Sequence, residues 1–283
     1  MQDNLKTSIK AALQAGEAIM QIYESDDFGI ETKDDDSPLT KADRAAHEII
    51  MEHLSPLGIP VLSEEGKNIP YEERKDWKQL WIVDPIDGTK EFIKRNGEFT
   101  VNIALIEDHQ PVMGVIYVPA KETLYYADHE KAYKLKDITV NNYEQNKTQV
   151  AQLPLVRDYD LVPSDSNRVP NKLVTSHQSL VTVVASKSHL SPETQDFIDD
   201  LKTKYDEVNT ISKGSSLKLC MVAEGTADYY PRFAPTMEWD TAAGQAICMA
   251  AGCNVIDQET KETMIYNRSE LLNNWFLVKK PKL

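Results

Sequence analysis

The sequence contains few cysteines and no long hydrophobic run, and both absences narrow the class of protein. Only three of the 283 residues are cysteines, Cys220, Cys248 and Cys253, and they form no CxxC pair. Thiols in apolar company without disulfide or metal-ligand spacing predict buried, reduced side chains in a cytoplasmic protein. No run approaches the ~18 apolar residues of a membrane-spanning helix. The early charges Asp3 and Lys6 also argue against a secretory signal peptide.

Basic residues are also fewer than acidic residues. Lysine and arginine number 31 against 45 aspartates and glutamates, which gives a formal net charge of −14. A surface this acidic repels phosphate backbones, so the composition argues against a broad binding face for a nucleic-acid polymer. A small anionic ligand stays compatible if metal ions and a few basic side chains invert the local field. The length allows one large or two ordinary domains with a sizeable core.

The most informative stretch is Trp81–Thr89, with the sequence WIVDPIDGT. The apolar run Leu80–Val83 predicts a buried strand. We expect this strand to stop at Asp84, because Pro85 has no N–H group to donate inside a sheet. Asp87 follows three residues later on the turn, so two carboxylates point into one small volume. They repel each other in a partly dry site unless a cation lies between them.

The residues after these two acids predict an anion site beside the cation. If Gly88 and Thr89 open a short helix over residues 90–94, their N–H groups can bind a phosphate. A cation next to an anion site indicates phosphate chemistry. The alternative is structural, with Asp84 as a turn residue and Asp87 as a helix cap.

Three further acids have comparable positions. Thr40 and Asp43 form a capping-box-like start to a helix whose apolar stripe places Asp43 on the inward face. Glu64 ends a short strand over residues 59–62, and Asp240 begins a helix. Oxygen ligands without a nearby His/Cys cluster favour a hard cation such as Mg²⁺. Taken alone, Asp43 and Asp240 are more simply explained as helix caps.

The secondary-structure pattern predicts a mixed α/β protein in two parts. Residues 1–135 open with a helical stripe over 3–24 and then mix strands and helices, whereas strands and helices alternate over residues 181–283. The stretch 136–180 is polar and lacks periodicity, which predicts a linker or insertion with at most short extended pieces.

Three motifs decide between these interpretations, because together they resemble the signatures of the inositol monophosphatase superfamily. They are Ser63-Glu64-Glu65, the WIVDPIDGT stretch and Trp239–Gly244, WDTAAG, and they occur in the order of that family. The resemblance implies an αβαβα layered fold and a Mg²⁺-dependent, lithium-sensitive phosphatase. Finer features are similar to one branch, the 3′(2′),5′-bisphosphate nucleotidases known in bacteria as CysQ. These features are Ser37–Asp43, Thr89–Phe92, Phe99–Ala104, Gly214–Lys218 and Tyr230–Arg232.

The resemblance also implies roles for individual residues. The metal ligands would be Glu64, Asp84, the main-chain carbonyl of Ile86, Asp87 and Asp240. Substrate would contact most of these groups, together with the phosphate cradle of Gly88 and Thr89. The Thr89 hydroxyl, polarised by Asp43, would orient the attacking water, and Glu64 would assist through the first metal. The nucleotide side would be formed by His189, Ser215, Lys218 and Arg232, with amides of the Gly214–Ser216 helix start completing a second anion site.

The expected activity is removal of the 3′-phosphate from 3′-phosphoadenosine 5′-phosphate, giving AMP and phosphate, with two or three Mg²⁺ ions and no covalent intermediate. The 5′-phosphosulfate analogue stays open as a second substrate. Two alternatives also stay open: an inositol or sugar phosphate phosphatase on the same scaffold, and a catalytically silent nucleotide or metal sensor. The sequence indicates no oligomeric state. Some relatives associate with the inner face of the cell membrane, although no anchor is visible here.

Overall fold

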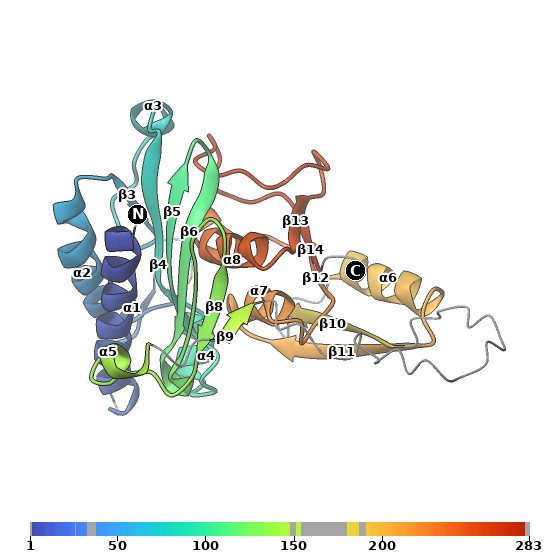
Figure 1. The fold of residues 1–283 in the computed structure, drawn as a ribbon, viewed down its shortest axis with the longest axis horizontal. Helices are drawn as coiled ribbons and strands as arrows, with labels where there is room; N and C mark the ends of the chain where they lie inside the picture. Colours follow the sequence, from blue (N-terminus) through green and yellow to red (C-terminus); the bar gives the residue numbers. More distant parts are fainter. Residues whose placement is uncertain are drawn as a thin grey trace, which may run out of the picture.

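The protein is built from five alternating layers of helix and sheet (Figure 1). The computed structural model describes residues 2–25, 27–32, 38–147, 151–153, 180–186 and 191–280. Two helices cover one face of a seven-stranded sheet, and two more lie between this sheet and a five-stranded sheet. A further helix covers the outer face of the five-stranded sheet (Figure 1). The layered mixed α/β fold expected from the sequence is therefore confirmed.

The outermost layer consists of α1, Gln2–Tyr23, and α2, Lys41–Leu54, which pack together against the larger sheet (Figure 1). The expected capping box is present at the start of α2. The Thr40 hydroxyl accepts the Ala42 N–H at 3.2 Å, and Asp43 Oδ2 accepts the Thr40 N–H at 2.7 Å. This local pairing fixes Asp43, which is only 1% exposed, at the inner end of α2.

The larger sheet has the order β3-β4-β5-β6-β7-β8-β9. Only the β3/β4 pair is parallel; the other neighbours form an antiparallel meander. The strands are β3 Val61–Ser63, β4 Gln79–Asp87, β5 Thr100–Glu107, β6 Gln110–Val118, β7 Thr123–Ala127, β8 Ala132–Leu135 and β9 Ala151–Leu153.

The path of β4 corrects one expectation. The strand does not stop at Asp84 but continues through Pro85 to Asp87. Pairing with β5 shifts in register between Asp84 and Asp87. This irregularity takes Pro85 out of the hydrogen-bonded ladder, so its missing N–H disrupts no pair. Both acids therefore lie on one strand, and the shift alters the regular alternation of their side chains.

The smaller sheet has the order β11-β10-β12-β14-β13. Its strands are β10 Leu180–Ser186, β11 Glu207–Lys213, β12 Tyr229–Arg232, β13 Asn254–Asp257 and β14 Phe276–Lys279. Strand β10 pairs in parallel with both neighbours, and the remaining pairs are antiparallel. Helix α6, Pro192–Lys202, forms the outer layer, and α7, Leu217–Ala223, lies on the inner side (Figure 1).

Helix α8, Glu238–Ala250, joins the two sheets, because it packs on β4, β5 and β6 of the larger sheet and also contacts β13. The approach to β6 is close: a Cβ atom on Gly114 would overlap the carbonyl oxygen of Ala243. One buried apolar cluster includes side chains of both sheets and of α8. The two parts of the chain thus share a core, which fixes α8 relative to β4.

Several short elements complete the described structure. They are β1 Glu31–Thr32, β2 Pro38–Leu39, η1 Ser55–Leu57, α3 Tyr71–Arg74, α4 Thr89–Ile93, η2 Pro119–Lys121 and α5 Tyr143–Asn146. Helix α5 and strand β9 lie within the expected insertion 136–180, where only short elements were expected. Residues 148–150 and 154–179 of that stretch lie outside the described part, and the division at 135 and 180 stays a prediction.

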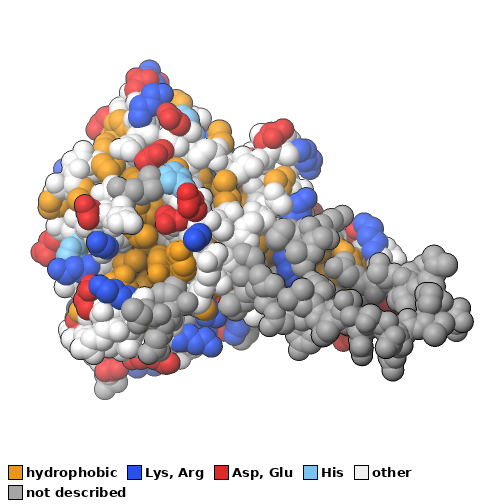
Figure 2. Space-filling model, in the orientation of Figure 1, with side chains coloured by type: hydrophobic (Ala, Val, Ile, Leu, Met, Phe, Trp, Pro, Cys, Tyr) orange, Lys and Arg blue, Asp and Glu red, His pale blue; other side chains and the backbone are white. Residues whose placement is uncertain are grey.

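Surface charge and thiol burial agree with the composition. On the face drawn in Figure 2, acidic and basic side chains of the described residues are interspersed, and they form no extended basic surface there. Cys220, Cys248 and Cys253 are all buried and unpaired, as expected. None of the helices in the described ranges has the length and apolarity to cross a membrane.

Candidate active site

Four carboxylates converge where β3, β4 and α8 meet. One carboxylate oxygen from each of Asp84, Asp87 and Asp240 lies within 4.8 Å of the other two. Glu64 directly follows β3, and its side chain hydrogen-bonds to that of Asp84. The pairing of β3 with β4 explains this contact, since Ser63 is in register with Val83 and the next residue of each strand is acidic.

Without a cation, the acidic cluster is electrostatically unfavourable. Asp84 is 1% exposed, and burial, followed by the charges of Glu64, Asp87 and Asp240, raises its pKa well above the usual value. Burial, followed by the charge of Asp87, raises the pKa of Asp240 to about 8. A set of converging oxygen donors fits a hard divalent cation, which would offset the mutual repulsion. The cluster could therefore hold metal ions.

The position of Asp240 differs in detail from the expectation. Helix α8 begins at Glu238, so Asp240 is the third helical residue and not the first. Its Oδ2 atom accepts the N–H of Met237 at 2.8 Å, which caps the helix start. One carboxylate oxygen thus stabilises α8 while the group as a whole faces the other acids. The structural and the functional interpretations of Asp240 are compatible.

A short segment after β4 carries the expected hydroxyl. Gly88 has φ = 96°, a left-handed conformation that strains any residue with a Cβ atom, and α4 begins directly after it at Thr89. The Thr89 hydroxyl lies 3.3 Å from Asp43 Oδ1 and 3.3 Å from the carbonyl oxygen of Ile86. The structure therefore brings together Asp43, Thr89 and Ile86, which are separated by up to 46 residues.

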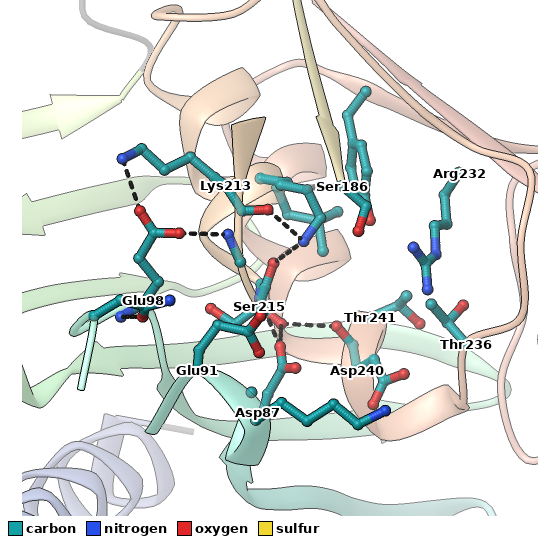
Figure 3. Close-up of a pocket in the computed structure, with 18 residues that line it drawn as sticks. Asp87, Glu91, Glu98, Ser186, Lys213, Ser215, Arg232, Thr236, Asp240 and Thr241 are labelled. Carbon is teal, nitrogen blue, oxygen red and sulfur yellow. Dashed lines mark hydrogen bonds and ion pairs between the residues drawn. The ribbon is translucent and has the colours of Figure 1, made fainter. Parts of the chain in front are cut away.

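A pocket adjoins the acidic cluster, and Figure 3 shows Asp87 and Asp240 within it. Lys218 and Arg232 contribute positive charge to the same pocket. Lys218 is 6% exposed, donates to the Ser215 carbonyl at 2.6 Å, and has its pKa lowered to about 8 by burial. This lysine is a buried pocket residue and not an exposed helix position.

Two polar atoms in this pocket lack a hydrogen-bond partner among the described residues. They are the hydroxyl of Ser215 and the Nε atom of Arg232, and both are buried. Ser215 also has φ = 46°, a left-handed conformation that is uncommon for a residue other than glycine. Buried donors without partners and backbone strain are concentrated at ligand-binding sites. Both residues were expected on the nucleotide side.

Two of the three amides in the Gly214–Ser216 segment are already hydrogen-bonded, which corrects part of the sequence-based expectation. The Gly214 N–H donates to Glu98 Oε2 at 2.9 Å, and the Ser216 N–H donates to Asp87 Oδ2 at 2.6 Å. Helix α7 begins at Leu217, so Ser215 lies one residue before the cap. Protein carboxylates therefore occupy two of the donors that the sequence suggested for a phosphate. His189 lies outside the described residues.

The sequence interpretation assigned no side-chain role to three polar residues beside the site. Glu98 also forms an ion pair with Lys213 at 2.9 Å, and Asn102 and Ser216 hydrogen-bond near Asp87. Asn102 lies within the Phe99–Ala104 motif and Ser216 within the Gly214–Lys218 motif, but only the structure shows that they meet. The 114 residues between them hide the contact from local pattern analysis.

Comparison with known proteins assigns the chain to a family. The model of the inositol monophosphatase family matches residues 1–281. The chain belongs to that family. Enzymes of the inositol monophosphatase family are metal-dependent, in agreement with an acidic cluster that could bind metal.

Individual relatives are similar over nearly their whole length. The 3′(2′),5′-bisphosphate nucleotidase CysQ of Salmonella typhimurium is 44% identical over 277 residues, 97% of this chain and 98% of that protein. The protein of the same name from Shigella flexneri is 44% identical over 270 residues, which cover 94% and 96% of the two chains.

Solved structures give the same picture. The crystal structure of CysQ from Bacteroides thetaiotaomicron has a TM-score of 0.83 at 49% identity and covers 100% of this chain and 99% of its own. An inositol monophosphatase from Thermotoga maritima has a TM-score of 0.66 at 22% identity, covering 98% and 92%, which is a likeness of fold alone.

Proposed function

We propose that this chain is a Mg²⁺-dependent phosphatase that hydrolyses the 3′-phosphate of 3′-phosphoadenosine 5′-phosphate to give AMP and inorganic phosphate. The relatives named as 3′(2′),5′-bisphosphate nucleotidases support this activity. The observation that carries the proposal is the composition of the pocket. An acidic cluster lies at one side, and the same pocket contains two buried donors, on Ser215 and Arg232, that have no hydrogen-bond partner within the described part of the chain.

The acidic residues would take part in this reaction as metal ligands. Glu64, Asp84, Asp87, Asp240 and the Ile86 carbonyl would hold two or three Mg²⁺ ions. Bound Mg²⁺ would supply charge stabilisation for the phosphate oxygens and lower the pKa of the attacking water. Such ions require several oxygen donors arranged around one point, which these carboxylates would supply.

Asp43 and Thr89 would orient the water. Asp43 Oδ2 is held by the N–H and the hydroxyl of Thr40, at 2.7 and 2.6 Å, which leaves Oδ1 directed toward the Thr89 hydroxyl. When Thr89 donates its proton to Asp43, its oxygen lone pairs are free to accept a hydrogen bond from water. The water then has one defined orientation toward the phosphorus atom, which is an entropic contribution to rate.

Ser215, Lys218 and Arg232 would recognise the nucleotide away from the reacting phosphate. An inositol phosphate has no second phosphate at the distance of the 5′-group, so these donors would discriminate between the two substrate classes. A charge-assisted contact of this kind contributes about 1.5–3 kcal/mol, or roughly 10- to 150-fold in kcat/KM.

The test compares kcat/KM for the bisphosphate, for adenosine 3′-phosphate and for inositol 1-phosphate. We expect the bisphosphate to be strongly preferred. Arg232→Ala should remove part of this preference while leaving slow hydrolysis of simple phosphomonoesters nearly unchanged. Lys202→Ala, which removes an exposed cation of α6 paired with Asp199, is the matched control. Equal values for the three substrates on the wild-type protein would overturn the nucleotidase assignment and favour a generic phosphatase.

A further inference from the structure

Ser216 lies between the two acids that come from different parts of the chain. Its backbone nitrogen and its hydroxyl oxygen are each 2.6 Å from Asp87 Oδ2. The same hydroxyl oxygen is 2.8 Å from the main-chain carbonyl oxygen of Asp240. Ser216 is 2% exposed, so water does not compete for these contacts. One small side chain therefore contacts both the end of β4 and the first turn of α8.

Two buried polar residues hold the Ser216 side chain through consecutive hydrogen bonds. Asn102 Nδ2 donates to the Ser216 hydroxyl oxygen at 2.9 Å, and the Thr100 hydroxyl donates to Asn102 Oδ1 at 3.0 Å. Asn102 and Thr100 both belong to β5 and are at most 1% exposed. The direction of donation in these hydrogen bonds leaves the Ser216 proton for Asp87 Oδ2 or for the Asp240 carbonyl. A fixed strand thereby determines the orientation of the serine.

These contacts give the two oxygen atoms of the Asp87 carboxylate different surroundings. Oδ2 receives the Ser216 N–H and approaches its hydroxyl, and Asn102 Nδ2 is 3.5 Å away. Hydrogen bonds to a carboxylate are stronger than those between neutral groups, so Oδ2 is firmly held. Oδ1 has no such contact among the hydrogen bonds described for this part of the chain. Residues that hold a ligand from behind commonly tune the affinity for the metal.

We propose that Ser216 is a positioning residue for the metal site, which holds Asp87 Oδ2 so that Oδ1 is presented to the cation and which links the start of α8 to β4. This inference rests on the proposed function, because Asp87 is a metal ligand only under that proposal. It assigns a role to the Ser216 side chain, whereas the sequence suggested only the Ser216 amide, as a donor to an anion.

The test measures metal binding directly. Ser216→Ala keeps the backbone N–H contact but removes the hydroxyl. Ser216→Cys is nearly isosteric and retains only a weak donor. Mg²⁺ affinity of the substrate-free protein is measured by calorimetry, together with the melting temperature in chelator. We expect both variants to bind Mg²⁺ more weakly, by about 10- to 100-fold for Ser216→Ala. KM for the nucleotide at saturating Mg²⁺ should change far less.

Ser8→Ala is the matched control, because Ser8 is a fully buried serine of α1 whose hydroxyl donates to the Leu5 carbonyl, remote from the acidic cluster. Wild-type Mg²⁺ affinity in either folded Ser216 variant would overturn the positioning role. An equal loss of affinity in Ser8→Ala, in proportion to lost stability, would also overturn it by showing a merely structural effect. A wild-type protein that binds Mg²⁺ but hydrolyses no bisphosphate would refute the proposed function and leave this test valid.

Discussion

Metal binding should depend on pH, because the acidic cluster holds protons when it is empty. Burial and the neighbouring carboxylates raise the pKa of Asp84 well above its usual value and that of Asp240 to about 8. With a pKa of about 8, Asp240 is largely protonated at neutral pH, whereas a metal ion binds the ionised form of a carboxylate. Each Mg²⁺ ion that uses these groups must therefore displace protons.

The size of this effect follows from the pKa of Asp240. With a value of about 8, the ionised fraction is ~1% at about pH 6 and ~50% at about pH 8. Displacement of this one proton should raise the observed affinity for Mg²⁺ by roughly 50-fold over that interval. Asp84 should make the slope steeper, because it also carries a raised pKa. The slope contributed by Asp240 should disappear above about pH 9.

The stability of the metal-free protein should change in the opposite direction. An unfolded aspartate has a pKa of about 3.9, so the folded state binds more protons than the unfolded state between about pH 4 and pH 8. Metal-free stability should therefore fall as the pH rises through this range. Mg²⁺ binds only the folded site and offsets the loss. The increase in melting temperature caused by Mg²⁺ should be larger at about pH 8 than at about pH 6.

The assay is thermal unfolding in chelator and in Mg²⁺ at several pH values, combined with calorimetric proton release in two buffers of different ionisation enthalpy. Asp240→Asn should reduce the number of protons released. Asp108→Asn, at an exposed hairpin position paired with Lys78, should leave it unchanged. Affinity that is independent of pH between about pH 6 and pH 8 would refute the assignment of protons to the empty cluster.

Three further predictions test other parts of the structure. Thr89→Ala and Asp43→Ala should each lower kcat by roughly 10²–10⁴-fold. The double variant should be little slower than either single variant, since both substitutions act on one hydroxyl. Additive losses in steady-state rates would argue that the two residues do not act as a pair. Gly114→Ala should destabilise the protein by about 1–3 kcal/mol in urea unfolding, because its methyl group overlaps the Ala243 carbonyl; an unchanged midpoint would contradict this close approach. Burial raises the pKa of the Cys248 thiol, so an aromatic disulfide reagent should label it only after denaturation; prompt labelling of the folded protein would show that the thiol is accessible.

Local interactions could be predicted from the sequence because their partners are close in the chain. The partners of the Thr40–Asp43 capping box are only three positions apart, and its pattern of residue types is sufficient to identify it. The helix start at Thr89 follows from Gly88, whose left-handed backbone conformation suits a glycine. The acids Asp84 and Asp87 were recognised as a pair for the same reason.

Competition for donors could not be predicted, because the competitors are distant in sequence. The Gly214 and Ser216 amides looked available to an anion, but Glu98 and Asp87 accept them from 116 and 129 residues away. The extension of β4 through Pro85 depends on a register shift against β5, which the strand itself does not encode. In each case the individual residue was recognised, and the missing information was its long-range partner.

The same long-range packing explains how the carboxylates can stay close together. Asp240 approaches Asp84 and Asp87 because α8 is fixed between the two sheets, and Ser216 hydrogen-bonds at the point where α7 and α8 meet β4. The apolar core that surrounds α8 stabilises this arrangement independently of the acids. Repulsion among the carboxylates can therefore be relieved only by protons or by cations, not by separation. A site of this kind is preorganised for metal, which is the condition under which positioning residues such as Ser216 affect affinity.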